Sequence, residues 1–345
     1  MNTGTTFDST GPPSQRRKPM RNPVSIGAAV LILILALTGC APEIRLFPDA
    51  RDPLREFTLE GTGREKVLVI PVRGNITDAP RREFMRTRPG MVRQIVSHLR
   101  KAEGDKRVRA ILLKIDSPGG TATASDLIYH ELMVFRQRTG VPIVAALMNV
   151  ATSGGYYIAL PADRIFAHPT TVTGSVGVIF VRPVVTGLME KIGIEADVHK
   201  TGPNKDMGSP FRPLTPGEDA MIQTLINTLG ARFLGLVKAR RNLGEAAMSE
   251  IGTARICLAD TAKSLGLIDE IGYLSDALAS AKSLAGLDRN ARVVVYRRTE
   301  YPEDNIYNTA ATTGPGPLVD VGLPAALAGL KAGFWYLWQP GAMAD

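Results

Sequence analysis

The stretch PIVAALMNVATSGGYY, residues 142–157, joins an apolar strand to a turn that can carry catalysis. Residues 142–147 form a short apolar run, as expected for a strand that is buried on both faces of a sheet. Ser153 then lies on a glycine-rich turn, ahead of a helix predicted to stop before Pro161. A serine on a tight strand-to-helix turn is a candidate nucleophile for acyl transfer, although Ser-Gly-Gly alone is usually an ordinary loop.

Strand and helix signals alternate around this turn. Strands are predicted at 66–72, 109–115 and 142–147. Helices are predicted at 91–102 and at 123–139, the second closed by Gly140. This order predicts an α/β fold with a parallel sheet covered by helices on both faces.

A long helix is predicted after Thr215-Pro216-Gly217-Glu218, a capping box with proline at the first helical position. Its apolar positions fall on one stripe, formed by Ile222, Leu225, Ile226, Leu229, Phe233 and Leu236. We interpret this stripe as core or as a subunit contact.

Composition excludes several functions. The chain has 345 residues, 44% of them hydrophobic, which is sufficient for a sizeable core. Its net charge of +8 includes no basic run interleaved with aromatic residues, so we expect no nucleic-acid partner. The four histidines have no ligand spacing with one another or with the two cysteines, so we expect neither a metal nor another cofactor.

The N-terminus resembles an export signal. A basic cluster precedes an apolar run at 24–38, which is shorter than the ~20 residues that a spanning helix needs. The run ends in Leu37-Thr38-Gly39-Cys40, which resembles a bacterial lipobox. We therefore predict lipidation of Cys40, with an uncleaved anchor helix as the alternative. In both cases the remaining chain is exported and membrane-attached, and Cys257 is a buried apolar residue.

The C-terminal segment 318–338 is apolar but contains Asp320, Pro324 and Lys331, so a spanning helix is not expected. Its end carries a cluster of aromatic side chains, Phe334, Trp335, Tyr336 and Trp338. Two interpretations remain open, a tail docked on the protein and a segment at the membrane interface.

Lys205 lies 52 positions after Ser153 and is the candidate base for it. Burial in an apolar site lowers the pKa of a lysine, and a neutral amine can accept a serine proton. The Gly154 N–H can face the oxyanion, and Gly119, in another glycine-rich turn, is the candidate second donor. Ser175 is a candidate for positioning the lysine amine.

The serine, lysine and glycine motifs occur in an order that resembles one known family. Residues 66–273 resemble the signal peptide peptidase A (protease IV) family, whose fold is similar to those of ClpP and the crotonases. The matching stretches are Asp116–Gly120, Ala151–Ala159, Ala162-Asp163, Thr173–Ile179, Lys191–Ile194, Gly202–Asp206 and Gly266–Gly272.

The resemblance implies a role for each candidate residue. Ser153 would be the nucleophile, Lys205 the general base, Ser175 the hydrogen-bond partner of the lysine, and the Gly119 and Gly154 N–H groups the oxyanion hole. The single catalytic copy resembles the short form, which assembles into rings that bring Ser and Lys together across subunit contacts. The implied function is a membrane-attached serine endopeptidase that degrades cleaved signal peptides, at the bacterial cell membrane on its exported side.

We predict four segments: an export signal or anchor at 1–40, a linker at 41–63, a peptidase domain at 64–285 and a C-terminal extension at 286–345. The family's usual Asp-Gly-Arg is replaced here by Gly252-Thr253-Ala254-Arg255, which puts only that turn in doubt.

Other classes remain as alternatives. A ClpP-like Ser-His-Asp peptidase would need a histidine about 25 residues after the serine, and residues 174–182 contain none. A stomatin-associated Ser/Lys peptidase would usually carry several membrane spans. A crotonase-type acyl-CoA enzyme would not need both Ser153 and Lys205. The last alternative is an inactive scaffold or binding lipoprotein.

Overall fold

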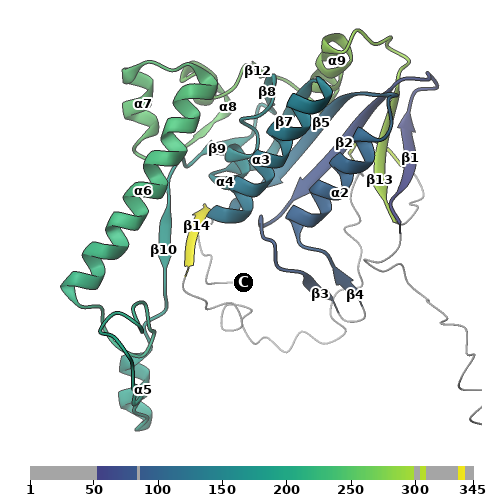
Figure 1. Ribbon diagram of the computed structural model, residues 1–345. Helices are drawn as coiled ribbons and strands as arrows, with labels where there is room; N and C mark the ends of the chain where they lie inside the picture. The colour runs from purple at the N-terminus through teal and green to yellow at the C-terminus, as the bar shows by residue number, and fades with distance from the viewer. Residues whose placement is uncertain (1–52, 84–85, 299–303, 308–332, 339–345) are drawn as a thin grey trace, which may run out of the picture. The chain divides into compact units, whose positions relative to one another are not determined.

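The structure is a computed structural model that describes residues 53–83, 86–298, 304–307 and 333–338 (Figure 1). All of them belong to the larger of two compact units, Pro48–Asp345. The predictions for the export signal, for Cys40 and for residues 318–332 concern parts of the chain outside the described residues.

A nine-stranded sheet forms the centre of this unit. Its strands are β1 Arg55–Glu60, β2 Lys66–Arg73, β5 Val108–Ser117, β7 Ile143–Thr152, β8 Arg164–Ala167, β9 Val172–Gly174, β11 Ile256–Leu258, β12 Glu270–Ile271 and β13 Arg292–Arg297. The main order is β1-β13-β2-β5-β7-β8-β12, in which every pair from β13 to β12 is parallel. β9 pairs parallel with the end of β7, while β1 and β11 pair antiparallel with β13 and β9.

Helices cover both faces of this sheet, which confirms the predicted α/β fold (Figure 1). α2 Met91–Glu103 and α3 Ala122–Thr139 pack on the face that carries Leu68 and Ile70 of β2. α9 Leu274–Leu284 packs on the opposite face with Val67 and Val69. Successive residues of β2 are therefore buried on opposite sides, which explains its continuous apolar sequence.

Local signals set the helix boundaries. Thr121 caps α3 by accepting a hydrogen bond from the Ala124 N–H, and Gly140 ends it in the left-handed conformation. The helix after Ser153, α4 Gly154–Tyr157, has only four residues, although its aromatic side chains are fully buried.

The second half of the chain adds α5 Thr186–Ile192, α6 Pro216–Arg241, α7 Glu245–Ile251 and α8 Ala259–Ser264. The predicted capping box between Thr215 and Glu218 is confirmed at the start of α6. Ile222 and Phe233 of the α6 stripe are buried, whereas Leu225 is 44% exposed, so only part of the stripe is core within one chain. By length and composition alone, α6 is the single helix among the described residues that could cross a membrane.

Two small sheets complete the unit. β3 Arg81–Glu83 pairs with β4 Arg86–Arg88. A three-stranded sheet has the order β10-β14-β6, with β6 at Gly119–Thr121, β10 at Ile179–Val181 and β14 at Gly333–Leu337.

The folded unit extends beyond the predicted domain limits. β1 lies inside the predicted linker 41–63, and β13 lies inside the predicted extension 286–345. Both belong to the central sheet because β13 pairs with β2 on one side and with β1 on the other. Residues 333–338 of the aromatic tail are docked on the protein, since β14 pairs with β6 and β10.

Candidate active site

Ser153 occupies a strained turn between β7 and α4. Its backbone angles are φ 52° and ψ −117°, a region that non-glycine residues rarely adopt and that is found mainly at functional sites. The Ser153 N–H donates to the Gly174 carbonyl at 2.8 Å, which fixes the turn against the end of β9. The Ser153 side chain is 1% exposed, and its Oγ has no hydrogen-bond partner among the described residues. A buried hydroxyl without a partner is costly, which favours a functional reason for it.

The two predicted oxyanion glycines lie side by side. A Cβ placed on Gly119 would lie 2.8 Å from the Gly154 nitrogen, and one on Gly154 would lie 3.2 Å from the Gly119 Cα. Gly119 also has φ +107°, a conformation that excludes ordinary side chains. These two backbones can approach so closely only because neither residue carries a side chain.

Hydrogen bonds hold the Gly119 turn in place. The Gly119 N–H donates to Ser117 Oγ at 3.1 Å, and the Ser117 hydroxyl donates to the Gly74 carbonyl at 2.7 Å. The Thr152 hydroxyl donates to the Pro118 carbonyl at 3.2 Å, which ties this turn to the residue before Ser153. The structure thus places Gly119 at the site, with its N–H engaged by Ser117 instead of facing the Ser153 hydroxyl.

Ser175 directly follows β9, just as Ser153 directly follows β7. Thr152 pairs with Gly174 in this ladder, so Ser153 and Ser175 follow at the same end of the two strands. Ser175 also has φ 52°, and its N–H donates to the Arg255 carbonyl at 2.8 Å. The predicted nucleophile and the predicted lysine-positioning serine therefore lie on neighbouring turns.

Lys205 is not joined to Ser153 within one chain. It is exposed in the segment between α5 and α6, where its backbone N–H donates to the Gly202 carbonyl at 3.2 Å. Since Ser153 Oγ has no partner among the described residues, Lys205 makes no hydrogen bond to it. The structure brings together Ser153, Gly119, Gly154 and Ser175, and shows no hydrogen bond from Lys205 to the Ser153 hydroxyl.

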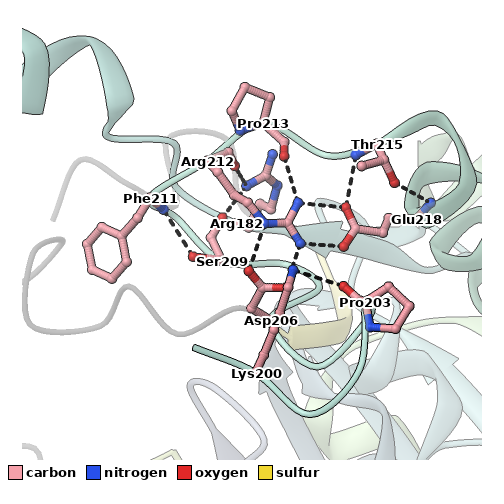
Figure 2. A network of polar contacts seen from close by, with 10 residues as sticks. All are labelled: Arg182, Lys200, Pro203, Asp206, Ser209, Phe211, Arg212, Pro213, Thr215 and Glu218. Carbon is pink, nitrogen blue, oxygen red and sulfur yellow. Dashed lines mark hydrogen bonds and ion pairs between the residues drawn. The ribbon is translucent and has the colours of Figure 1, made fainter. Parts of the chain in front are cut away.

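The segment that carries Lys205 is held by a polar network (Figure 2). Arg212 binds the Asp206 carboxylate through Nε and Nη2, both at 2.8 Å, and binds Glu218 through Nη1 at 2.8 Å. Lys200 Nζ adds a contact of 2.7 Å to Asp206, the residue that directly follows Lys205. Arg182 donates to the Ser209 carbonyl at 2.6 Å. This network links both ends of the segment to the start of α6.

The two carboxylates of this network, Asp206 and Glu218, have lowered pKa values and therefore stay charged to lower pH than usual. Hydrogen bonds from Arg212 lower the pKa of Glu218 from its ordinary value of 4.5 to about 2. The same guanidinium, with Lys200, lowers the pKa of Asp206. A carboxylate with a lowered pKa stabilises the fold above its ordinary pKa and loses that contribution as the pH falls toward the lowered value. The network is therefore intact at neutral pH and weakens below about pH 4.

An aromatic cluster beside Ser153 was not identified from the sequence. The Tyr157 ring of α4 packs on the Phe233 ring of α6, with centroids 4.7 Å apart, and edge-on against Tyr129 of α3 at 5.5 Å. The Tyr157 hydroxyl donates to Asp126 Oδ1 at 2.6 Å. Tyr157 was part of the quoted motif and Phe233 was part of the α6 stripe, but only the fold places them together.

The fold and the turn define an α/β protein with a serine on a strained strand-to-helix turn beside paired glycines. The model of peptidase family S49 matches residues 136–288. A putative signal peptide peptidase of Enterococcus faecium is 34% identical over 253 residues, which are 73% of this chain and 73% of that protein. Protease 4 of Haemophilus influenzae is 32% identical over 70% of this chain and 38% of its own length.

Solved structures also match, at low similarity. A mutant of the 1510-N membrane-bound stomatin-specific protease is 18% identical, with a TM-score of 0.39 over 64% of this chain and 86% of that one. ClpP1 from Listeria monocytogenes is 17% identical, with a TM-score of 0.40 over 61% of this chain and 94% of that one. From the sequence matches, the chain belongs to the signal peptide peptidase A family of S49 peptidases, which is a family of serine proteases.

Proposed function

We propose that the protein is a membrane-attached serine endopeptidase that uses Ser153 as nucleophile and Lys205 as general base. The observation that carries this proposal is the buried Ser153 hydroxyl, which has no hydrogen-bond partner among the described residues and lies on a strained turn beside Gly119 and Gly154. The proposed substrates are cleaved signal peptides and similar apolar peptides. The name of the Enterococcus faecium relative supports that substrate class.

The proposed reaction follows acyl-enzyme chemistry. The Lys205 amine accepts the Ser153 proton as Oγ attacks the carbonyl carbon, and the Gly154 N–H stabilises the oxyanion. Gly119 supplies the second donor when its N–H exchanges Ser117 Oγ for the substrate oxygen. The amine of the leaving peptide takes up the proton, and water then hydrolyses the ester. Ser175, on the turn next to Ser153, orients the lysine amine.

We further propose that Lys205 serves the Ser153 of a neighbouring subunit in a homo-oligomer. Lys205 is exposed and makes no hydrogen bond to Ser153 of its own chain. α5, which precedes its segment, has no buried residue, and its Leu188 and Ile192 are 59% and 57% exposed. A ring of head-to-tail contacts would cover these apolar side chains and complete every site. Lipidation at Cys40 would hold this ring at the membrane surface, on its exported side.

Mixed oligomers test the proposal. Ser153→Ala and Lys205→Ala variants, each purified alone, are expected to hydrolyse a fluorogenic apolar peptide at background rates. When the two variants are co-expressed, about a quarter of the sites would combine an intact serine with an intact lysine from the next subunit, and activity should return to that extent. Background activity of the mixture would contradict a dyad shared between subunits. Activity of Lys205→Ala alone would contradict Lys205 as the base.

The Arg212 network gives a second expected result. Arg212→Ala removes the cation that joins Asp206 to Glu218, so the Lys205 segment loses its fixed position. We expect kcat to fall about tenfold with KM nearly unchanged, because the base is displaced while the peptide cleft is not. Arg212→Lys should restore part of kcat. Arg138→Ala, at a 66% exposed arginine on α3, is the matched control and should leave kcat unchanged. Equal kcat values for Arg212→Ala and the parent would contradict this positioning role.

A further inference from the structure

The strand β7, which leads to the candidate nucleophile, contains a bulge. Ile115 of β5 pairs with Leu147 of β7 in the parallel ladder between the two strands. Ser117, two residues further along β5, pairs with Ala151, which is four residues further along β7. Residues 148–150 therefore lie opposite a single residue of β5, and β7 has two extra residues at this place. Bulges re-aim the residues that follow them and are over-represented next to active sites.

The bulge sets the level of Ser153 relative to Gly119. Without the extra residues, the ladder would place Gly119 opposite Ala151, and Ser153 would lie about 6–7 Å farther along, at the usual rise of a strand. With them, the observed register continues to Gly119 at the level of Ser153. The Thr152 hydroxyl, which donates to the Pro118 carbonyl at 3.2 Å, agrees with this register. The extra residues thus bring the nucleophile level with the oxyanion glycines.

Asp116 closes the bulge from the side of β5. It is the β5 residue opposite the bulge, and its Oδ1 accepts a hydrogen bond from the Val150 N–H at 3.3 Å. The carboxylate takes the place of the backbone acceptor that a regular ladder would supply. Its other oxygen, Oδ2, lies 4.0 Å from Arg73 Nε, and the Asp116 side chain is 34% exposed.

Thr171 closes the bulge from the opposite side. Its hydroxyl donates to the Leu147 carbonyl at 2.9 Å and also contacts the Met148 carbonyl oxygen. Thr171 is fully buried, at the place where the neighbour of β7 changes from β8 to β9. The bulge is therefore held between two side chains, of which only Asp116 is accessible to solvent.

We propose that Asp116 is a positioning residue for the reaction at Ser153, because its carboxylate fixes the β7 bulge that brings this serine to the oxyanion glycines. The inference rests on the proposed function of Ser153. Asp116 makes no hydrogen bond to the Ser153 hydroxyl and acts through the backbone that leads to it. Attack and oxyanion stabilisation take place on one carbonyl group, so a shift of about 1 Å between Ser153 and the glycines costs much of the rate.

Two substitutions separate the hydrogen bond of Asp116 from its charge. Asp116→Ala removes the acceptor of the Val150 N–H, and water can take its place because the site is open to solvent. We expect the protein to fold, with kcat for a fluorogenic apolar peptide about tenfold lower and KM nearly unchanged. Asp116→Asn keeps a carbonyl oxygen for the Val150 N–H. It should stay within about twofold of the parental kcat, since an exposed ion pair contributes little.

Asp163→Ala is the matched control. Asp163 Oδ2 accepts the Ile143 N–H at 2.9 Å, so this variant removes the same kind of bond from the start of the same strand. It also removes an ion pair to Arg136. We expect it to be less stable to denaturant than Asp116→Ala, with parental kcat per folded molecule.

Amide hydrogen exchange gives a readout that does not depend on activity. The Val150 amide should exchange faster in Asp116→Ala than in the parent, and at the parental rate in Asp116→Asn, because only the alanine variant lacks the acceptor. An unchanged rate in Asp116→Ala would overturn the role of Asp116 in closing the bulge.

The kinetic outcomes separate the two proposals. An active parent together with parental kcat for Asp116→Ala overturns the positioning role and leaves the proposed function standing. An Asp116→Asn variant as slow as Asp116→Ala also overturns it, since the charge would then be the cause. An equal fall of kcat in Asp163→Ala overturns it as well, because any weakening of β7 would have the same effect. A parent that does not hydrolyse the peptide contradicts the proposed function, and the positioning role fails with it.

Discussion

Replacing Ser153 with alanine is expected to lower kcat/KM for peptide hydrolysis by at least about 10⁴-fold, because the acyl-enzyme of the proposed reaction forms on the Ser153 hydroxyl. The same change should leave the fold intact or make it more stable. Ser153 Oγ is buried without a hydrogen-bond partner among the described residues, and an unsatisfied buried hydroxyl costs about 1–3 kcal/mol. Loss of activity together with an increase of about 1 kcal/mol in the free energy of unfolding is therefore the expected signature.

Peptide hydrolysis and denaturant unfolding of the same preparations provide this comparison. Ser249→Ala is the matched control, since Ser249 is an exposed serine on α7. It should keep parental activity and stability. Activity of Ser153→Ala within tenfold of the parent would show that Ser153 is not the nucleophile.

Gly119→Ala is expected to lower kcat/KM by about 10²–10³-fold, through loss of oxyanion stabilisation. The new Cβ would lie 1.9 Å from the carbonyl oxygen of Tyr336 in β14 and 2.8 Å from the Gly154 nitrogen. Since both of these atoms belong to backbone, neither can move aside cheaply. A peptide approaching the Gly154 N–H would meet the new methyl group.

Gly140→Ala separates this clash from backbone strain. Gly140 also has a positive φ, +66°, but a Cβ there would meet no atom within 4 Å. Both variants should lose about 1 kcal/mol of stability from the unfavourable φ, and Gly119→Ala should lose more because of the clash. Only Gly119→Ala should also lose activity per folded molecule. Parental kcat/KM for Gly119→Ala would contradict the assignment of the Gly119 turn to the oxyanion site.

Much of the fold could be predicted from local patterns. The apolar runs of β2 and β5 and the periodic residues of α2 predicted these elements to within two residues, whereas β7 continues five residues past its predicted end. The start of α6 was predicted closely because Thr215 and Glu218 form their capping box within one helical turn. These elements depend on neighbours in the sequence, and such signals can be interpreted without tertiary contacts.

The places of β1 and β13 in the sheet could not be assigned from the sequence. β1 was placed in a linker and β13 in an extension, yet β13 lies between β1 and β2. Their pairing joins residues more than 200 positions apart, such as Thr58 and Val294. No short-range pattern contains that information, because strand pairing depends on the whole path of the chain.

The sequence by itself determined the α/β class, the serine on its glycine-rich turn and the second glycine-rich turn at Gly119. These features depend on residue type and on short spacing, since only glycine accepts φ +107° at that position. The tertiary structure alone decided that Gly119 meets Gly154, that Lys205 makes no hydrogen bond to the Ser153 hydroxyl of its own chain, and that the Tyr336 ring packs on those of Tyr157 and Phe233. Each of these depends on contacts between segments far apart in the sequence, and those contacts exist only once the sheet has placed its strand ends together.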